Sequence, residues 1–262
     1  MNSSYRVLCA FLHRDVYILR KHLGMHALNV CILGPTFSAF IFGYLQPRIL
    51  VAHMPHNLGA IMAVGSILIA LLEMSFRPAL AFILDLRGDR FVEYQTVLVR
   101  PYLVIFERII FSSLVTFVMA CPFFVVVKLL LGSEFDTSAT SWPLVILMLF
   151  FSSLMIAAYH ILAACLITTD DGTERLWMRF NVPLLALGGF VLPWYIMYGA
   201  VPWLGYLDLL NPMLYITEGL RRALFGSPNF FAVTPCVIML LTFTAIFTYA
   251  AIVRFKQRID HV

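Results

Sequence analysis

The residues of this sequence that could do chemistry are the few ionisable side chains in its long apolar runs. Glu73 and Glu107 lie near the ends of such runs, and His160 lies within one. Ionisable groups at such positions are candidates for handling ions or substrates. Glu73 precedes Arg77 by one helical turn, so we expect an ion pair there rather than a substrate role. We expect His160 to be packed and hydrogen bonded.

The spacing of the other polar residues favours neither a metal site nor catalysis. His53 and His56 in "HMPH" resemble a metal pair, but Pro55 separates them and no third ligand lies nearby. No nucleophile lies beside a base, and no two carboxylates share a depth in the apolar runs. We therefore expect neither catalysis nor a cofactor on this chain. A charged cluster that we expect to be solvated comprises Asp170, Asp171, Glu174 and Arg175.

The composition indicates a protein that crosses a membrane several times. Of the 262 residues, 61% are hydrophobic and 12% are charged, whereas charged residues make up about 25% of a soluble domain. The net charge of +4 does not indicate a nucleic acid partner, because the basic residues lie at the ends of apolar runs, where membrane topology accounts for them. The five cysteines lack metal or redox spacing and are expected to pack as small apolar residues.

Six apolar segments are long enough to cross a bilayer as helices. No internal repeat or linker divides them, so we predict an all-α membrane protein with a single domain over residues 1–262. The missing repeat is weak evidence against a secondary transporter. The predicted spans are residues 26–46, 58–76, 102–130, 143–168, 182–198 and 232–253.

The distribution of Lys and Arg predicts the orientation of these spans. If both termini lie in the cytoplasm, most of the 18 basic residues fall on the cytoplasmic side, as the positive-inside rule requires. The outer side then keeps only Arg48, Lys128, Arg221 and Arg222.

The first residues predict a helix that lies along the membrane surface, over residues 4–22. At 100° per residue the apolar side chains share one face and the basic side chains lie opposite, which suits a helix at the lipid–water interface. The alternative is a solvated start to the first span. The apolar face comprises Tyr5, Leu8, Cys9, Leu12, Val16 and Leu19, and the polar face Arg6, His13, Arg14, Arg20 and Lys21.

The longest cytoplasmic stretch contains a second short helix, within residues 88–100. Gly88 and Asp89 interrupt the preceding helix, and Asp89 is a suitable cap for a helix that begins at Arg90. This helix is too polar to span a membrane, yet it carries Phe91, Tyr94 and Val97 at helical spacing. It could dock into a cleft on a soluble partner or pack on its own protein.

A polar, helix-like motif, "NPMLYITEGLRRALFG", precedes the last span on the outer side. Asn211 is a suitable cap, Pro212 suits the first turn, and Arg221 lies late in the helix, where a cation is favoured. The aromatic residues Trp203, Tyr206 and Tyr215 suit the level of the lipid headgroups.

The order of these parts resembles the membrane subunit of type-2 ATP-binding-cassette (ABC) exporters, the transport permease family. That resemblance covers essentially the whole chain, and the outer motif carries it most specifically, with Asn211, Pro212, Tyr215, Arg221 and Gly226 in matching places. "DRFVEYQTVLVRPY" is similar to the family's coupling stretch, although Arg100-Pro101 stands where members often have Ala-Pro. The residues expected to couple to an ATPase are Asp89, Arg90, Phe91, Glu93, Tyr94 and Val97.

The resemblance implies a permease that moves an amphipathic substrate outward, such as a lipid, a lipid-linked glycan or a drug. It implies that residues 200–227 re-enter the outer leaflet as a helical hairpin and cap the export path; alternatively, this segment only packs the outer surface. The sequence has no G-x-x-x-x-G-K-[ST] phosphate loop, so ATP and Mg would be bound by a separate nucleotide-binding ATPase subunit. Further implied partners are a second permease copy (a homodimer, or a sister permease) and membrane lipids, in a bacterial inner membrane.

Two other classes of function remain as alternatives. An ion-coupled secondary transporter would need several carboxylates inside the membrane, and the spans offer essentially Glu73 and Glu107. An integral-membrane lipid enzyme would need a cluster of His, Asp or Cys facing one leaflet, and no such cluster is apparent.

Overall fold

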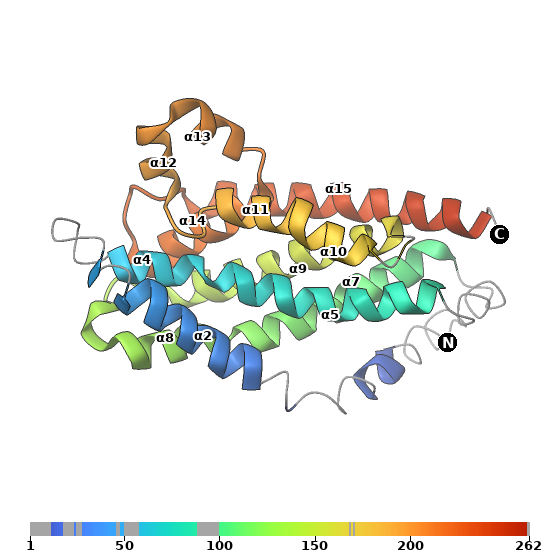
Figure 1. Cartoon of the computed structure of the whole chain (residues 1–262), viewed down its shortest axis with the longest axis horizontal. Coiled ribbons are helices and arrows are strands. Elements are labelled where there is room, and N and C mark those ends of the chain that lie inside the picture. The colour runs from blue at the N-terminus through green and yellow to red at the C-terminus, as the bar shows by residue number, and fades with distance from the viewer. Residues whose placement is uncertain are drawn as a thin grey trace.

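The computed structural model describes residues 12–17, 24, 28–45, 48–49, 58–87, 100–167, 169 and 171–260, which contain helices and no strand. Four helical stretches are long and apolar enough to cross a membrane: Gly59–Leu86, Pro101–Glu134, Trp142–Leu166 and Val233–Ile259. They lie side by side along the long axis of the molecule (Figure 1). The chain is therefore a multi-pass membrane protein.

The first two of these stretches each consist of two helices joined end to end. α4 (Leu58–Gly65) continues into α5 (Ile67–Arg87) through a turn at Ser66, and α7 (Pro101–Ala120) continues into α8 (Phe123–Leu131), which a short 3-10 turn (Gly132–Glu134) follows. The α4–α5 stretch continues beyond residue 76, where the predicted span ends, because Pro78 is accommodated inside α5. Neighbouring helices in a membrane protein can compensate for the backbone bond that a proline removes.

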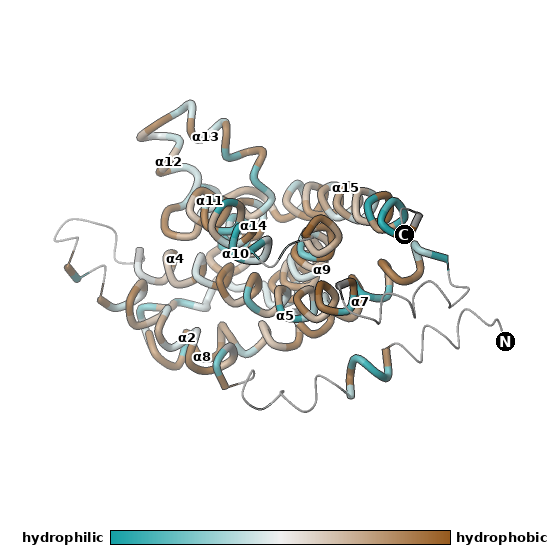
Figure 2. The backbone as a smooth tube through the Cα atoms, turned by 45° about the vertical axis from the view of Figure 1, so that its right-hand side comes forward, coloured by the Kyte–Doolittle hydropathy of each residue, from teal (hydrophilic) through white to brown (hydrophobic). Residues whose placement is uncertain are grey.

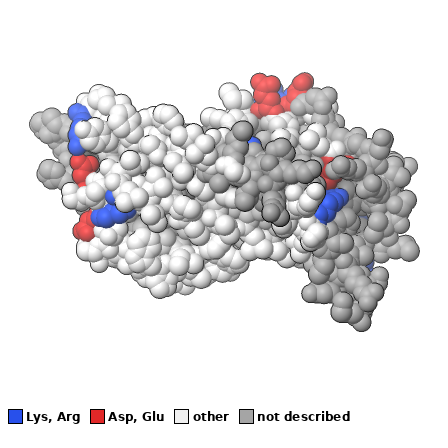
Figure 3. Space-filling model, turned by 90° about the horizontal axis from the view of Figure 1, so that it is seen from below, with Lys and Arg blue, Asp and Glu red and all other residues white. Residues whose placement is uncertain are grey.

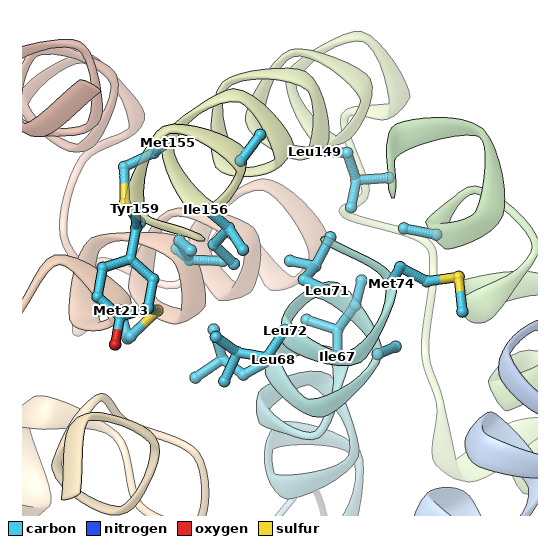
Figure 4. Close-up of a cluster of buried hydrophobic side chains, with 14 of the residues drawn as sticks. Ile67, Leu68, Leu71, Leu72, Met74, Leu149, Met155, Ile156, Tyr159 and Met213 are labelled. Atoms are coloured by element: carbon cyan, nitrogen blue, oxygen red, sulfur yellow. The ribbon is translucent and has the colours of Figure 1, made fainter. Parts of the chain in front are cut away.

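α9 (Trp142–Leu166) is the central helix of the bundle. It packs against α5, α7, α14 (Pro212–Phe225) and α15 (Val233–Asp260). Small buried side chains on α9, such as Ser152, Ser153 and Ala157, allow the neighbouring backbones to approach closely. Figure 4 shows part of the resulting core, where side chains of α5, α9 and α14 meet. The labelled ones are Ile67, Leu68, Leu71, Leu72, Met74, Leu149, Met155, Ile156, Tyr159 and Met213.

The predicted first span is helical over the described residues 28–45, but irregular. Wide π-helical turns (Leu28–Leu33 and Ala39–Leu45) flank the short α2 (Gly34–Ser38), which contains Pro35 in its first turn. The apolar part, Cys31–Leu45, is shorter than the four long stretches. Of the predicted N-terminal helix over residues 4–22, the structure describes residues 12–17, which are helical.

The predicted fifth span, residues 182–198, needs correction because it is not one continuous helix. A helical stretch formed by α10 (Gly172–Leu176), a π-helical turn (Trp177–Asn181) and α11 (Val182–Leu187) ends at Gly188. The next helix, α12, begins only at Trp194 and ends at Ala200. Gly189, at a φ of +72°, adopts a left-handed conformation that favours glycine, and Pro193 restarts the helix. The adjacent glycines in "LGGFVLPW" signal this break in the sequence.

The helices that follow the break lie partly outside and partly inside the bundle. α12 and α13 (Pro202–Asp208) project from one side of the molecule, whereas α14 returns into it (Figures 1 and 2). We call this end of the bundle the α13 end, and the end at which α5, α9 and α15 terminate the C-terminal end. In Figure 3 charged side chains gather near the two ends, with a broad uncharged band between them. Such a band suits the hydrocarbon layer of a membrane.

Candidate functional site

α14 contains the outer motif, and its two ends form as the sequence predicts. Asn211 precedes the helix in an extended conformation, and its side-chain oxygen accepts a hydrogen bond of 3.0 Å from the backbone N–H of Met213. Pro212 occupies the first turn. At the other end Gly226 adopts a φ of +63°, and its N–H donates to the carbonyl of Arg222 at 3.0 Å. These caps define a helix that begins and ends at fixed residues.

The structure buries nearly all of this helix, which the sequence interpretation placed on the outer side of the membrane. Its buried residues include the charged Glu218 and Arg221, whose side chains are both fully inaccessible. α14 contacts α4, α5, α9, α11 and α15. Tyr215 is likewise buried and donates its hydroxyl to the Leu209 carbonyl at 2.7 Å. A helical pattern with charges on one side indicates a solvated face only when no partner covers that side.

Arg221 joins two interruptions of the membrane helices. Its Nε donates to the carbonyl of Ile61 at 3.1 Å, one turn before α4 ends. Its Nη2 donates to the carbonyl of Gly189 at 2.6 Å, in the break after α11. Its Nη1 lies 3.3 Å from a carboxylate oxygen of Glu218, which balances the buried charge. One guanidinium therefore holds α4 and the α11–α12 break against α14.

Glu218 bonds to the other side of the same break, at the start of α12. Its carboxylate accepts a hydrogen bond of 3.0 Å from the backbone N–H of Trp194, the first residue of α12. A negative charge at a helix N-terminus is stabilising, and a cation near terminal carbonyls is as well. We call Glu218 and Arg221 the buried ion pair of α14. The sequence interpretation included Arg221 but missed Glu218, for which the only signal was the spacing of three residues between two opposite charges.

Two glycines make room for the ion pair. A Cβ atom at Gly65 would lie 1.9 Å from the Phe190 carbonyl oxygen and 2.7 Å from Nη2 of Arg221. At Gly189 it would lie 2.5 Å from the Thr217 hydroxyl oxygen, which itself donates to the Gly188 carbonyl at 2.9 Å. Substitution at either glycine would push backbone away from α14.

Asn211 also ties the start of α14 to its surroundings. Its Nδ2 donates to the Leu184 carbonyl at 2.9 Å and to a carboxylate oxygen of Asp208 at 3.0 Å. The second carboxylate oxygen of Asp208 is buried without a hydrogen-bond partner among the residues that the structure describes. Burial raises the pKa of Asp208 to about 7. α13 lies outside the four long helices.

A second cluster of buried charges lies at the C-terminal end. Arg108 of α7 bonds to the carboxylates of Asp15, from the helical residues 12–17, and of Asp85, near the end of α5, the latter at 3.0 Å. Arg14 lies 3.5 Å from Asp85, and Glu107 lies 3.6 Å from Arg108. Asp15 is buried whereas Val16 is 55% exposed, so the sequence interpretation missed the face of this helix that packs inward.

The predicted coupling residues Asp89, Arg90, Phe91, Glu93, Tyr94 and Val97 lie outside the described residues. Arg100 is described: it is extended and exposed, and α7 begins at Pro101 directly after it. Asp85 and Arg108 therefore lie on the two helices that border this segment. The cluster of Asp15, Asp85 and Arg108 connects the N-terminal helix to both of them.

The other residues that the sequence analysis singled out pair with neighbouring side chains, lie exposed on the surface, or lie outside the described residues. Glu73 pairs with Arg77 at 3.1 Å, as predicted. His160 is fully buried, with Nε2 3.4 Å from Nδ2 of Asn181, whose carbonyl oxygen accepts a 2.7 Å hydrogen bond from the Tyr159 hydroxyl. Trp203 and Tyr206 are exposed, and Arg175 bonds to Asp171 at 3.2 Å on the surface. His53, His56 and Asp170 lie outside the described residues.

Comparison with known proteins identifies one family. Residues 21–225 match the family model described as ABC-2 type transporter. This range includes the buried ion pair of α14 and the predicted coupling segment, and it leaves out the helical residues 12–17 and α15. No individual curated protein matches the chain.

Proposed function

Because the chain belongs to the ABC-2 type transporter family, we propose that it is the membrane-spanning permease subunit of an ABC exporter. The exporter moves an amphipathic substrate outward, and a separate ATPase subunit that binds ATP and Mg drives it. Two copies of the chain, or this chain and a sister permease, form the membrane core with two ATPase subunits. The basic residues of α15, among them Arg254, Lys256 and Arg258, support a cytoplasmic location for the C-terminal end.

The buried ion pair of α14 is the observation that carries this proposal. An exporter needs an outer barrier that stays closed until the ATPase drives it open. Helices that are bonded to one another can move together when such a barrier opens. Arg221 and Glu218 bond α4, the α11–α12 break and α14 to one another. Packed interfaces of this kind have discrete arrangements rather than continuous ones. We therefore assign α14 and the break to the outer gate.

The predicted coupling segment, residues 88–100, is the proposed docking site for the ATPase. It lies between α5 and α7, and the cluster of Asp15, Asp85 and Arg108 joins these two helices. A displacement of the segment would thus reach α5, α7 and the N-terminal helix together. The force then travels by rigid helix motion, a two-state change that ATP and substrate bias.

The experiment that tests this function is co-purification with the ATPase subunit that it requires, sought first in the neighbouring reading frame, followed by transport in vesicles. Reversing Glu93 to Lys together with Phe91→Ala and Tyr94→Ala should uncouple ATP hydrolysis from transport and leave membrane insertion intact. The matched control, Glu174→Lys, reverses an exposed charge at the same end of the bundle and should leave both activities unchanged. If no ATPase co-purifies and an ion gradient drives transport, the secondary-transporter alternative replaces this proposal.

The substrate class is tested separately, by stimulation of ATP hydrolysis in lipid nanodiscs. We expect lipids or amphipathic drugs to stimulate the complex, because a path bordered by aromatic side chains suits an amphiphile better than a small ion. Stimulation by small ions or sugars alone would contradict the substrate class and leave the permease function standing.

A further inference from the structure

A cleft of about 470 Å³ opens at the C-terminal end of the bundle, away from the buried ion pair of α14. α9 forms one wall, the stretch from α10 to Phe180 forms the second, and Phe247 of α15 contributes to the third. Its volume falls within the range of about 300–1,000 Å³ that small-molecule sites occupy. The lining residues are Tyr159, Leu162, Ala163, Leu166, Ile167, Thr169, Gly172, Arg175, Leu176, Phe180 and Phe247.

The polarity of the cleft changes along the helix axis. Thr169 and Arg175 lie at its mouth, beyond the residue at which α9 ends. Leu166 and Phe180 are apolar, more than half exposed, and face the cleft from opposite walls. Tyr159 lies seven residues before Leu166, about 10 Å further into the membrane at 1.5 Å per residue. A lipid has the same arrangement, with a polar headgroup at the helix ends and tails that point toward the middle of the bilayer.

Aromatic rings continue the apolar wall beyond the cleft. The ring of Tyr159 lies 5.7 Å from that of Phe247, and Phe247 lies 5.9 Å from Phe243 on the same helix. α15 runs from the α13 end to the C-terminal end, so Phe243 lies deeper in the membrane than Phe247. An acyl chain that enters at Leu166 can therefore extend along these rings.

We propose that this cleft binds one anionic lipid from the adjoining leaflet, with its phosphate at Arg175 and one acyl chain between Leu166, Phe180 and Phe247. Arg175 is available to a phosphate because its present partner, Asp171, is 3.2 Å away in an exposed pair. Exposed ion pairs contribute little to stability. The proposal depends on the membrane placement of the chain and not on the direction of transport.

The headgroup must supply the selectivity of this site. An acyl chain gains little by leaving the bilayer for the cleft, because lipid tails are already as apolar as leucine. A basic side chain near an anionic lipid contributes about 1 kcal/mol, which is about a five-fold preference. The cleft of each protein chain should thus prefer phosphatidylglycerol over phosphatidylcholine with the same acyl chains by about five-fold.

Native mass spectrometry of the purified transporter, titrated with these two lipids, tests the proposal. Arg175→Gln should remove the five-fold preference and leave phosphatidylcholine binding unchanged. Arg179→Gln, an exposed basic residue one turn further along, should keep the preference. An equal loss of the phosphatidylglycerol preference in both variants would show that the surface charge as a whole attracts the lipid, and would overturn the proposal of a single site.

A second pair of variants tests the acyl-chain position. Leu166→Trp should fill the cleft and reduce retention of both lipids at least several-fold, whereas Ile146→Trp, an exposed site on the same helix near the α13 end, should not. Unchanged lipid binding in Leu166→Trp would overturn the proposal. A change in the oligomeric state without a change in lipid binding would also overturn it, because a second copy of the chain would then be the occupant of the cleft. ATP-driven transport that persists without any lipid preference would contradict only the lipid site and leave the permease function standing.

Discussion

Arg221 and Arg108 are both buried arginines, but they hold opposite ends of the bundle in different ways. Arg221 bonds to two backbone carbonyls at interruptions of helices and to a single carboxylate, that of Glu218. Arg108 bonds to the carboxylates of Asp15 and Asp85, and its guanidinium lies 5.2 Å from the centre of the Phe82 ring. The first arginine fixes the path of the backbone, whereas the second joins side chains of segments that are separate in the sequence.

This difference indicates how each end can move. Bonds to backbone carbonyls keep a helix break in one conformation, so the α13 end is expected to move as a block. Side-chain ion pairs can change partners through rotation of the side chains, without a change in the path of the backbone. The C-terminal end, next to the predicted coupling segment, is therefore expected to rearrange more readily. The following variants test this comparison in order of decreasing effect.

The largest effect is expected for Arg221→Met. The substitution leaves the Glu218 carboxylate buried without this cation and removes the Arg221 donors from two carbonyls, and removal of one partner from a buried pair costs about 3–5 kcal/mol. The unfolding midpoint of the detergent-purified protein should fall accordingly. Glu218→Gln in the same chain should restore part of the loss. The neighbouring Arg222→Met serves as control, and equal losses at both positions would contradict the special role of Arg221.

A smaller but clear effect is expected for Arg108→Gln. Asp15 and Asp85 then lose their shared cation, yet Arg14 remains 3.5 Å from Asp85 and 3.1 Å from Asp15. We expect a loss of about 2–3 kcal/mol in the free energy of unfolding, below that of a fully buried pair. Arg77→Gln breaks a half-exposed pair with Glu73 and should cost below about 1 kcal/mol. If the two variants lose equal stability, the cluster does not hold the C-terminal end.

Asp15→Asn should act locally rather than globally. It weakens the bond between the N-terminal helix and Arg108, and a hydrogen bond to a charged group contributes about 1.5–3 kcal/mol. Amide hydrogen exchange of residues 12–17 should accelerate, while the unfolding midpoint changes little. His13→Gln, an exposed neighbour, should leave the exchange rates unchanged. A large drop in the global midpoint would show that this helix is part of the main cooperative unit.

Asp208 is expected to give the α13 end a dependence on pH, which is a change of slope rather than a loss of stability at one pH. Burial raises the pKa of Asp208 to about 7, above its ordinary value near 4. Between these values the folded state keeps a proton that the unfolded state releases, so stability falls as the pH rises through this window and levels off above pH 7. Asp208→Asn should flatten this slope and raise the midpoint at pH 8 by about 2–4 °C for each 1 kcal/mol recovered. If the slope of stability against pH is unchanged in Asp208→Asn, another titratable group is responsible for that slope.

The sequence by itself determined the features that depend on neighbouring residues. The length of apolar runs predicted the helices that begin near Leu58, Tyr102, Pro143 and Ala232, because a helix needs about 20 predominantly apolar residues to cross lipid. The caps at Asn211 and Gly226 followed from local hydrogen bonding and from the left-handed conformation that glycine tolerates. The pair of Glu73 and Arg77 followed from the spacing of one helical turn.

Only the tertiary structure decided which charged residues are buried and what they hold. Asp15 and Arg108 are 93 positions apart, and Arg221 and Ile61 are 160 positions apart, so no local pattern relates them. A helix with charges along one side has the same sequence pattern whether water or another helix covers that side. For α14 the covering is supplied by α4, α5, α9, α11 and α15, and nearly all of the helix is buried. The physical reason is that burial of a charge depends on partners that the fold brings together, and here the fold supplies Arg221 with two carbonyls from other helical stretches.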